Sequence, residues 1–273
     1  MSAVAKGYQL HERNMDFVWR DAAAKGARRL TQAQIDSFNE HGFSLVENAF
    51  DPAEIAAVIA AIDPIEAAYE SFVRDKKNGQ HVLTTVGAIT FAAHIVKQSP
   101  VLQAFARHKV YQDICHDLIG GDVRLYWDQA VYKKAQIPQE FPWHQDNGYT
   151  FIEPQQYVTC WTPLVDVNEQ NGCPMIAPGL HKLGTLNHWV TGIGLKCLDE
   201  VPAAVSVPAK AGDVIVFSSL APHRTGPNLK TGTVRKAYIL QYAPDGAHTI
   251  LKDGAVVEQN DPERQFSILQ GGQ

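Results

Sequence analysis

One segment of the sequence, Phe141–Tyr149, carries a histidine and an aspartate two residues apart, His144 and Asp146. Residues i and i+2 of a β-strand point to the same face, so this spacing predicts an imidazole and a carboxylate directed at one point. His223, which follows an expected strand at 213–217, is the candidate third ligand. Two histidines and one carboxylate bind Fe(II) on one face and leave coordination positions open. The residues therefore predict a metal centre made of His144, Asp146 and His223.

A second chemical feature is Arg235, which opens a β-rich run downstream of His223. A guanidinium inside a barrel can hold a carboxylate through two parallel hydrogen bonds. Taken alone, this arginine is also consistent with a surface salt bridge, and a His–x–Asp spacing alone also occurs in surface hydrogen-bonded pairs. The combination favours a metal site with a buried clamp for a carboxylate.

The elements that must position these residues differ between the two halves of the chain. In the N-terminal half, Thr31 is a predicted N-cap and a helix follows it. A short strand is expected at 43–46, and Asp51 with Pro52 begins a second helix that runs through Ala60. A third helical region is expected at 100–118. Residues 1–29 are interpreted as a partly ordered arm, and residues 30–273 as a single domain.

From residue 120 onward, short β-rich runs alternate with Gly, Pro and Asn turn signals. Strands are expected at 123–132, 157–164, 214–217 and 237–242. This pattern favours an antiparallel sandwich or barrel over βαβ units. The sequence therefore predicts a mainly β fold with flanking helices.

Composition narrows the class of protein and partner. The chain has 273 residues, a formal net charge of −5, 45% hydrophobic and 19% charged residues, as in an ordinary soluble enzyme. Because it lacks a Lys/Arg-rich run, neither nucleic acid nor a membrane is the expected partner; a small molecule is. We expect no secretory signal and no bilayer-spanning segment. The four cysteines are widely spaced, which favours reduced thiols and a cytoplasmic location.

In their order along the chain, these segments resemble the phytanoyl-CoA dioxygenase family of Fe(II)/2-oxoglutarate oxygenases. The resemblance rests on residues 30–43, 144–146, 160–166, 171–182 and 212–213, and on His223, Thr225, Asn228 and Arg235. Within 171–182 the sequence departs from the family signature at Leu180, where the family has Ser.

The resemblance implies a double-stranded β-helix (jelly-roll, cupin-like) core with Fe(II) held by the same triad. It implies that Arg235 holds the distal carboxylate of 2-oxoglutarate, and that Thr225, Trp161 and Gln129 also contact this cosubstrate. The implied reaction consumes O2, releases succinate and CO2, and hydroxylates a C–H bond of a small, largely apolar molecule.

Residues near the expected ligands are candidates for the substrate pocket. Trp143, Asn147 and Tyr149 flank the ligands, and Tyr126 and Trp127 lie in the preceding strand. This largely aromatic set with few charges suits a mid-sized apolar molecule.

Two other functions remain open from the residues. The same triad could activate water in a metal-dependent hydrolase on a cupin-like barrel. A non-catalytic barrel that binds a small ligand is the other alternative. Arg235 and Thr225 distinguish the oxygenase from the hydrolase, because a hydrolase needs no buried clamp for a dicarboxylate.

Overall fold

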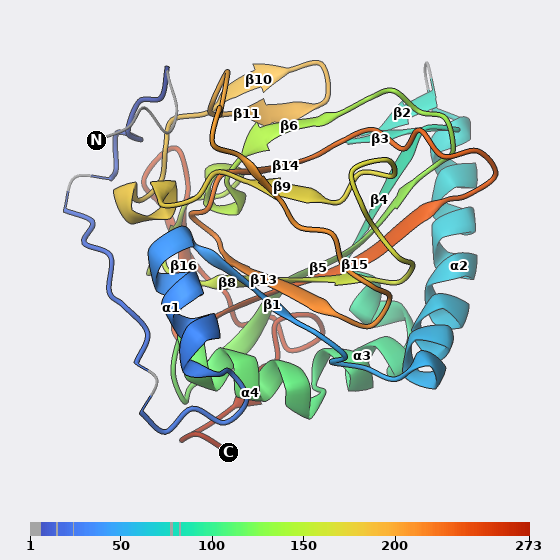
Figure 1. Cartoon of the computed structure of the whole chain (residues 1–273). Helices are drawn as coiled ribbons and strands as arrows, with labels where there is room; N and C mark the ends of the chain where they lie inside the picture. Colours follow the sequence, from blue (N-terminus) through green and yellow to red (C-terminus); the bar gives the residue numbers. More distant parts are fainter. Residues whose placement is uncertain (1–6, 15, 24, 77–78, 82) are drawn as a thin grey trace.

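The computed structural model describes residues 7–14, 16–23, 25–76, 79–81 and 83–273. Helices flank a β structure at the left, at the right and below in the view of Figure 1. The helices are α1 (Gln32–His41), α2 (Pro52–Arg74), α3 (Pro100–Ala106) and α4 (Lys109–Leu118), with 3-10 turns η2 (Ile95–Gln98), η3 (Asp146–Gly148) and η4 (Leu180–Leu183).

The helix starts follow from their capping residues. Thr31 forms a capping box with Gln34 at the start of α1, as the sequence predicts. Asp51 forms another at the start of α2, which continues well beyond Ala60 in spite of Pro64. The single helical region expected at 100–118 is two helices, because the ring of His108 accepts from the Val110 amide at 3.2 Å and starts α4.

One large antiparallel sheet contains the long strands that the sequence predicts. Its strand order among the described residues is β1-β13-β8-β15-β5-β4-β3-β2, with β18 also paired to β5. The bounds are β1 (Phe43–Val46), β2 (Gln80–His81), β3 (Thr84–Thr85), β4 (Ile89–Ala93), β5 (Val123–Lys133), β8 (Val158–Pro163), β13 (Val214–Ser218), β15 (Arg235–Pro244) and β18 (Ser267–Leu269).

A smaller antiparallel sheet faces the large one, and its order is β12-β9-β14-β6. Its strands are β6 (Phe141–His144), β9 (Pro174–Ile176), β12 (Val205–Ser206) and β14 (His223–Thr225). The two sheets line a common cavity and form the expected jelly-roll arrangement. Outside them lie a hairpin of β10 (Trp189–Thr191) and β11 (Gly194–Lys196), and a sheet of β7 (Ile152–Glu153), β16 (His248–Ile250) and β17 (Val256–Glu258).

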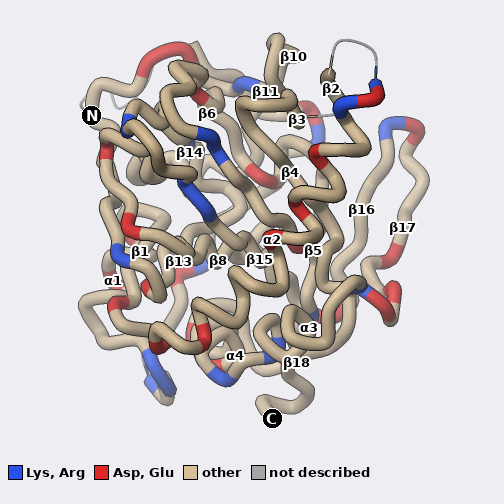
Figure 2. Tube along the Cα trace, turned by 90° about the vertical axis from the view of Figure 1, so that its right-hand side faces the viewer, with Lys and Arg blue, Asp and Glu red and all other residues tan. Residues whose placement is uncertain are grey.

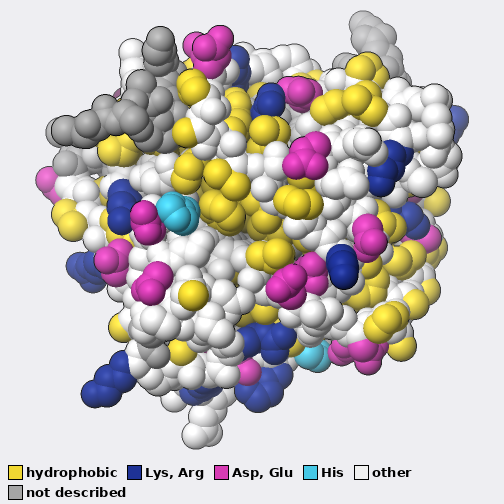
Figure 3. Space-filling model, viewed as in Figure 1, with side chains coloured by type: hydrophobic (Ala, Val, Ile, Leu, Met, Phe, Trp, Pro, Cys, Tyr) yellow, Lys and Arg dark blue, Asp and Glu magenta, His cyan; other side chains and the backbone are white. Residues whose placement is uncertain are grey.

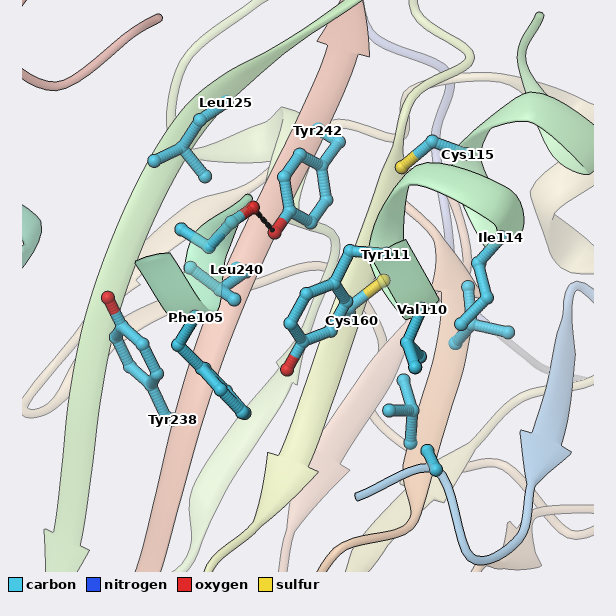
Figure 4. Close-up of a cluster of buried hydrophobic side chains, with 14 of the residues drawn as sticks. Phe105, Val110, Tyr111, Ile114, Cys115, Leu125, Cys160, Tyr238, Leu240 and Tyr242 are labelled. Carbon is cyan, nitrogen blue, oxygen red and sulfur yellow. Dashed lines mark hydrogen bonds between the residues drawn. The ribbon is translucent and has the colours of Figure 1, made fainter. Parts of the chain in front are cut away.

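The hydrophobic core lies between the large sheet and the helices. In Figure 4, Phe105 and Tyr111 from the helical layer lie against Tyr238 and Tyr242 of β15. Buried tyrosines need hydrogen-bond partners. The hydroxyl of Tyr242 donates to the carbonyl of Ala106 at 2.8 Å, and that of Tyr111 lies 2.7 Å from Thr162 Oγ1. This packing supports β5, β8 and β15 from the side opposite the cavity.

The described parts of the expected arm, residues 7–14, 16–23 and 25–29, lie along the body of the protein. Arg13 donates to the carbonyls of Ile250 and Leu251 at 2.8 and 2.6 Å. The amides of Arg28 and Arg29 donate to the carboxylate of Asp117 at 2.8 and 2.9 Å. Residues 1–6 of the expected arm lie outside the described residues, and its boundary with the domain stays a prediction.

Basic and acidic residues alternate along the trace (Figure 2), and charged side chains of both signs are interspersed on the face shown in Figure 3. Among the described residues, no helix is both long and apolar enough to cross a bilayer.

Candidate metal and cosubstrate site

The three predicted metal ligands converge in the structure. Nε2 of His144 and Nε2 of His223 lie 3.9 and 3.8 Å from the same oxygen, Oδ1 of Asp146. One ligand atom from each residue can be chosen so that all lie within 4.8 Å of one another. This spacing leaves room for a metal ion between them.

The route by which the chain brings these residues together differs from the expected one. His144 is the last residue of β6, but Asp146 is the first residue of η3 and does not lie on the strand. The juxtaposition arises because the chain turns directly after the strand. His223, the first residue of β14, pairs directly with His144 across the smaller sheet.

Backbone carbonyls fix the direction of both imidazoles. Nδ1 of His144 lies 2.8 Å from the carbonyl oxygen of Pro142, and Nδ1 of His223 lies 3.0 Å from that of Ala221. A carbonyl only accepts, so each Nδ1 carries the hydrogen and each Nε2 presents a lone pair. Burial, followed by the nearby His223, holds the pKa of His144 well below its ordinary value. His144 is thus in the neutral form that binds metals.

The aspartate is held by a hydrogen bond from the larger sheet. Oγ1 of Thr159, on β8, donates to Oδ2 of Asp146. This contact leaves Oδ1 facing the two imidazoles. The sequence analysis did not identify Thr159, since a threonine in a buried strand carries no distinctive signal.

Gln145, between two of the ligands, is fully buried and connects three segments. Its Nε2 donates to the carbonyls of Gly184 and Leu220 at 3.0 and 2.6 Å, and its Oε1 accepts from the Leu186 amide at 2.6 Å. The loop of Asp146 is thereby attached to the segment that precedes His223. This role of Gln145 was not predicted from the sequence either.

All four residues expected to contact the cosubstrate line one cavity together with the triad: Arg235, Thr225, Trp161 and Gln129. They come from both sheets, which explains why they are distant in sequence. The guanidinium carbon of Arg235 lies 5.5 Å from the ring centre of Trp161.

Arg235 is the feature that tests whether a carboxylate fits this cavity. Its side chain is 1% exposed, and none of its three guanidinium nitrogens has a hydrogen-bond partner among the described residues. Burial lowers its pKa to about 10, so it remains a cation at neutral pH. A buried cation with unpaired donors is costly unless an anion pairs with it. A cosubstrate carboxylate fits this position.

A wider cavity of about 260 Å³ adjoins the first, and both are bordered by His144 and Asp146. Tyr126, Trp127 and Tyr149 line it, as expected for a substrate pocket. Its other lining residues are Leu83, Phe91, Gln129, Phe141, Thr150 and Gln241. Phe91 lies on β4, a strand that the sequence analysis did not anticipate.

Two residues expected in this pocket lie elsewhere. Trp143 packs in a hydrophobic cluster with Leu180, Leu186 and Leu198, away from the cavity. The reason is strand alternation, because His144 points inward and its neighbour therefore points outward. Asn147 is buried in the loop, where its side chain donates to Thr185 and accepts from the Ile152 amide. The prediction that these two residues line the pocket was wrong.

The sequence of this chain is similar to those of several known proteins. The sequence profile of the phytanoyl-CoA dioxygenase (PhyH) family matches residues 38–237, well over half of the chain. The ectoine dioxygenase of Bordetella parapertussis is 25% identical over 227 residues, which are 75% of this chain and 73% of that protein. The methylphosphonate hydroxylase of Gimesia maris is 27% identical over 252 residues, 88% of this chain and 89% of that protein.

Solved structures share the arrangement of the sheets. The non-heme alpha ketoglutarate dependent carbocyclase SnoK from nogalamycin biosynthesis superposes with a TM-score of 0.71 at 18% identity. The match covers 88% of this chain and 97% of that one. The predicted fold class, a jelly roll with flanking helices, is confirmed.

Proposed function

Because this chain belongs to the phytanoyl-CoA dioxygenase family of non-haem Fe(II)/2-oxoglutarate-dependent oxygenases, we propose that it hydroxylates an unactivated C–H bond of a small, largely apolar and uncharged molecule. In this proposal His144, Asp146 and His223 hold the iron. Arg235 and Thr225 hold the distal carboxylate of 2-oxoglutarate, with Trp161 and Gln129 as further contacts.

The observation that carries the proposal is the unpaired guanidinium of Arg235 in the same cavity as the triad. A metal-dependent hydrolase would need the triad but not a buried cation aimed at an anion. A non-catalytic binding protein would need neither. The family and the arginine together favour the oxygenase over both alternatives.

When bound, iron and 2-oxoglutarate supply the activation of O2, with release of succinate and CO2 and insertion of one oxygen atom into the substrate. The residues of this chain position these groups. The carbonyls behind each Nδ1 aim the imidazoles, and Thr159 fixes one oxygen of Asp146. Apolar walls from both sheets exclude water from the reacting centre.

The lining of the wider cavity supports an uncharged substrate. Among the described lining residues, Asp146 is the one charged side chain, and it is assigned to the metal. A charged group of the substrate would therefore lose its hydration without gaining a partner, which is unfavourable. Gln241 and Thr150 offer hydrogen bonds to neutral polar atoms, and Tyr126 and Trp127 offer flat apolar surface.

The test is succinate formation from 2-oxoglutarate by the Fe(II)-loaded protein under air, measured across matched pairs of small molecules. Each pair consists of a neutral compound and its carboxylate counterpart, such as a methyl ester and the free acid. We expect the neutral members to stimulate succinate formation and to be hydroxylated. Turnover confined to the carboxylates, or to acyl-CoA thioesters, would contradict the proposed substrate class.

The four cysteines, Cys115, Cys160, Cys173 and Cys197, are free and buried. Their reduced state supports the further proposal of a reducing, cytoplasmic location.

A further inference from the structure

Lys133 is a second buried basic residue next to the cosubstrate cavity. It is the last residue of β5, its side chain has no exposure, and it pairs directly with Arg235 in the β5–β15 ladder. Directly opposite residues of an antiparallel pair share one face of the sheet. Two basic side chains are therefore adjacent in the interior, and it is unfavourable for both to be charged unless an anion is nearby.

The contacts of the Lys133 ammonium are three oxygen acceptors. Nζ lies 2.6 Å from the carbonyl oxygen of Gly226, 3.3 Å from that of Gln139 and 3.5 Å from Oγ1 of Thr225. An ammonium has three donors and a neutral amine has two, so this set suits the charged form. None of the three partners carries a charge.

Two titratable groups act on Lys133, Arg235 and Glu140. Arg235 faces it from β15, whereas β4 presents the apolar Ile89. Glu140 acts from the segment before β6, but it is half exposed and already paired with Arg224 at 2.6 Å. Burial, followed by the charge of Arg235, lowers the pKa of Lys133 to about 6.

We propose that Lys133 is a positioning residue of the cosubstrate site: it donates to Oγ1 of Thr225 and thereby directs the hydroxyl hydrogen of Thr225 at the carboxylate held by Arg235. This inference rests on the proposed function. A threonine hydroxyl whose oxygen accepts from an ammonium has its own hydrogen free for an anion. Lys133 also adds a positive charge behind the carboxylate.

A proton is taken up from solvent when 2-oxoglutarate binds. In the free protein the charge of Arg235 opposes protonation of Lys133, and a bound carboxylate cancels that opposition. The pKa of Lys133 is therefore higher in the complex than in the free protein. Binding is strongest below the free pKa of about 6 and weakens as the pH rises above it.

The first test is calorimetry on the anaerobic Fe(II)-loaded protein, with 2-oxoglutarate titrated near neutral pH in two buffers of different ionisation enthalpy. We expect uptake of up to one proton per site. 2-Oxobutyrate, which keeps the keto-acid end but lacks the distal carboxylate, should bind without uptake. This measurement needs no variant, and an absence of proton uptake with 2-oxoglutarate overturns the charge linkage between Lys133 and the bound carboxylate, whereas the contact with Thr225 is tested by the variant below.

The second test is Lys133→Met, with its iron content and thermal melting checked first. Its Kd for 2-oxoglutarate should rise about 10- to 100-fold, the loss of one charge-assisted hydrogen bond, and the proton uptake should disappear. Affinity for 2-oxobutyrate should not change. The matched control is Lys134→Met, because Lys134 directly follows β5 and pairs with Glu66 and Glu70 of α2 at 2.9 and 3.3 Å.

Failure of the inference and failure of the proposed function give different results. Wild-type 2-oxoglutarate affinity in Lys133→Met, together with weak binding in Arg235→Ala, overturns the role of Lys133 alone. Wild-type affinity in Arg235→Ala overturns the cosubstrate site itself.

Discussion

Each imidazole of the triad is directed by a carbonyl two residues before it, so the backbone sets the direction of the ligand before any metal binds. Because the imidazoles are already oriented, we expect the affinity for the metal ion to fall mainly when a substitution removes one of the ligand side chains. The cosubstrate cavity differs, because the guanidinium of Arg235 has no hydrogen-bond partner in the part of the chain that the structure describes. We therefore expect Arg235 to contribute to the binding of an anion, not to the binding of the metal ion.

We therefore expect His144→Ala, Asp146→Ala or His223→Ala to abolish stable binding of Fe(II), while the protein stays folded. The measurement is iron content per chain after anaerobic loading and desalting, with one iron expected for the wild type. His248→Ala, a change at a histidine on β16 outside the site, is the control and should keep its iron. Stoichiometric iron in a variant that lacks all three ligands would contradict the metal centre.

Arg235→Ala should weaken 2-oxoglutarate binding far more than iron binding. Truncating one member of a buried charge pair costs about 2–5 kcal/mol, much of it from leaving the other charge unpaired. Arg235→Lys should restore only part of the affinity, since an ammonium lacks the planar fork. The measurement is titration of the Fe(II) protein with 2-oxoglutarate.

Arg224→Ala is the control for this prediction, because Arg224 lies on β14 and pairs with the partly exposed Glu140 at 2.6 Å. If Arg224→Ala lost 2-oxoglutarate and Arg235→Ala kept it, the clamp would be Arg224.

The length of a strand decided whether it could be predicted from the sequence. The strands at 123–132, 157–164, 214–217 and 237–242 were found within about two residues, because their apolar runs are long and end at turn residues. The short strands β6 and β14 carry no such signal. Their pairing contains an irregularity, since His223 lies opposite His144 and Thr225 lies opposite Phe141.

That irregularity affects which side chains of β6 face the cavity. It places one extra residue on β6, a β-bulge, and such bulges redirect side chains. Phe141 and His144 consequently both border the cavity, although a regular strand would separate them. The triad was predicted from residue types, whereas the outward direction of Trp143 follows from its place next to His144 on the strand, an alternation that was not applied to it.

The corrected pocket changes which substitution should uncouple the reaction. Trp127→Ala removes a wall of the substrate cavity, so O2 and 2-oxoglutarate should still be consumed while hydroxylation falls. A displacement of about 1 Å can cost on the order of a hundredfold in a positioned step. The measurement is the ratio of hydroxylated product to succinate. Trp143→Phe should leave this ratio unchanged. An equal drop of the ratio in both variants would show that Trp143 also contacts the substrate.

On the scale of the whole molecule, the helical layer and the arm hold the large sheet from outside the cavity. The helices pack on the face of β15 and β8 that is opposite the site. The arm is joined to this layer at Asp117 of α4, whose buried carboxylate accepts from the amides of Arg28, Arg29 and Leu30 at 2.8–2.9 Å. Sequence periodicity predicted one helical region at 100–118, which contains α4, but not this contact, since the donors are backbone groups.

Asp117→Ala should therefore destabilise the protein without affecting the metal centre. An unsatisfied buried donor costs about 1–3 kcal/mol, and three amides lose their acceptor, although water can reach the two that are only part-buried. We expect a loss of about 3 kcal/mol in the free energy of unfolding and a Tm lower by about 6–12 °C. Iron binding below the transition should match the wild type, because Asp117 lies in the helical layer and the triad lies between the sheets. Glu263→Ala, which removes an exposed ion pair with Lys97, is the control and should leave the Tm close to that of the wild type, because exposed ion pairs contribute little to stability. A Tm for Asp117→Ala equal to that of this control would mean that the arm contributes nothing to the stability of the fold.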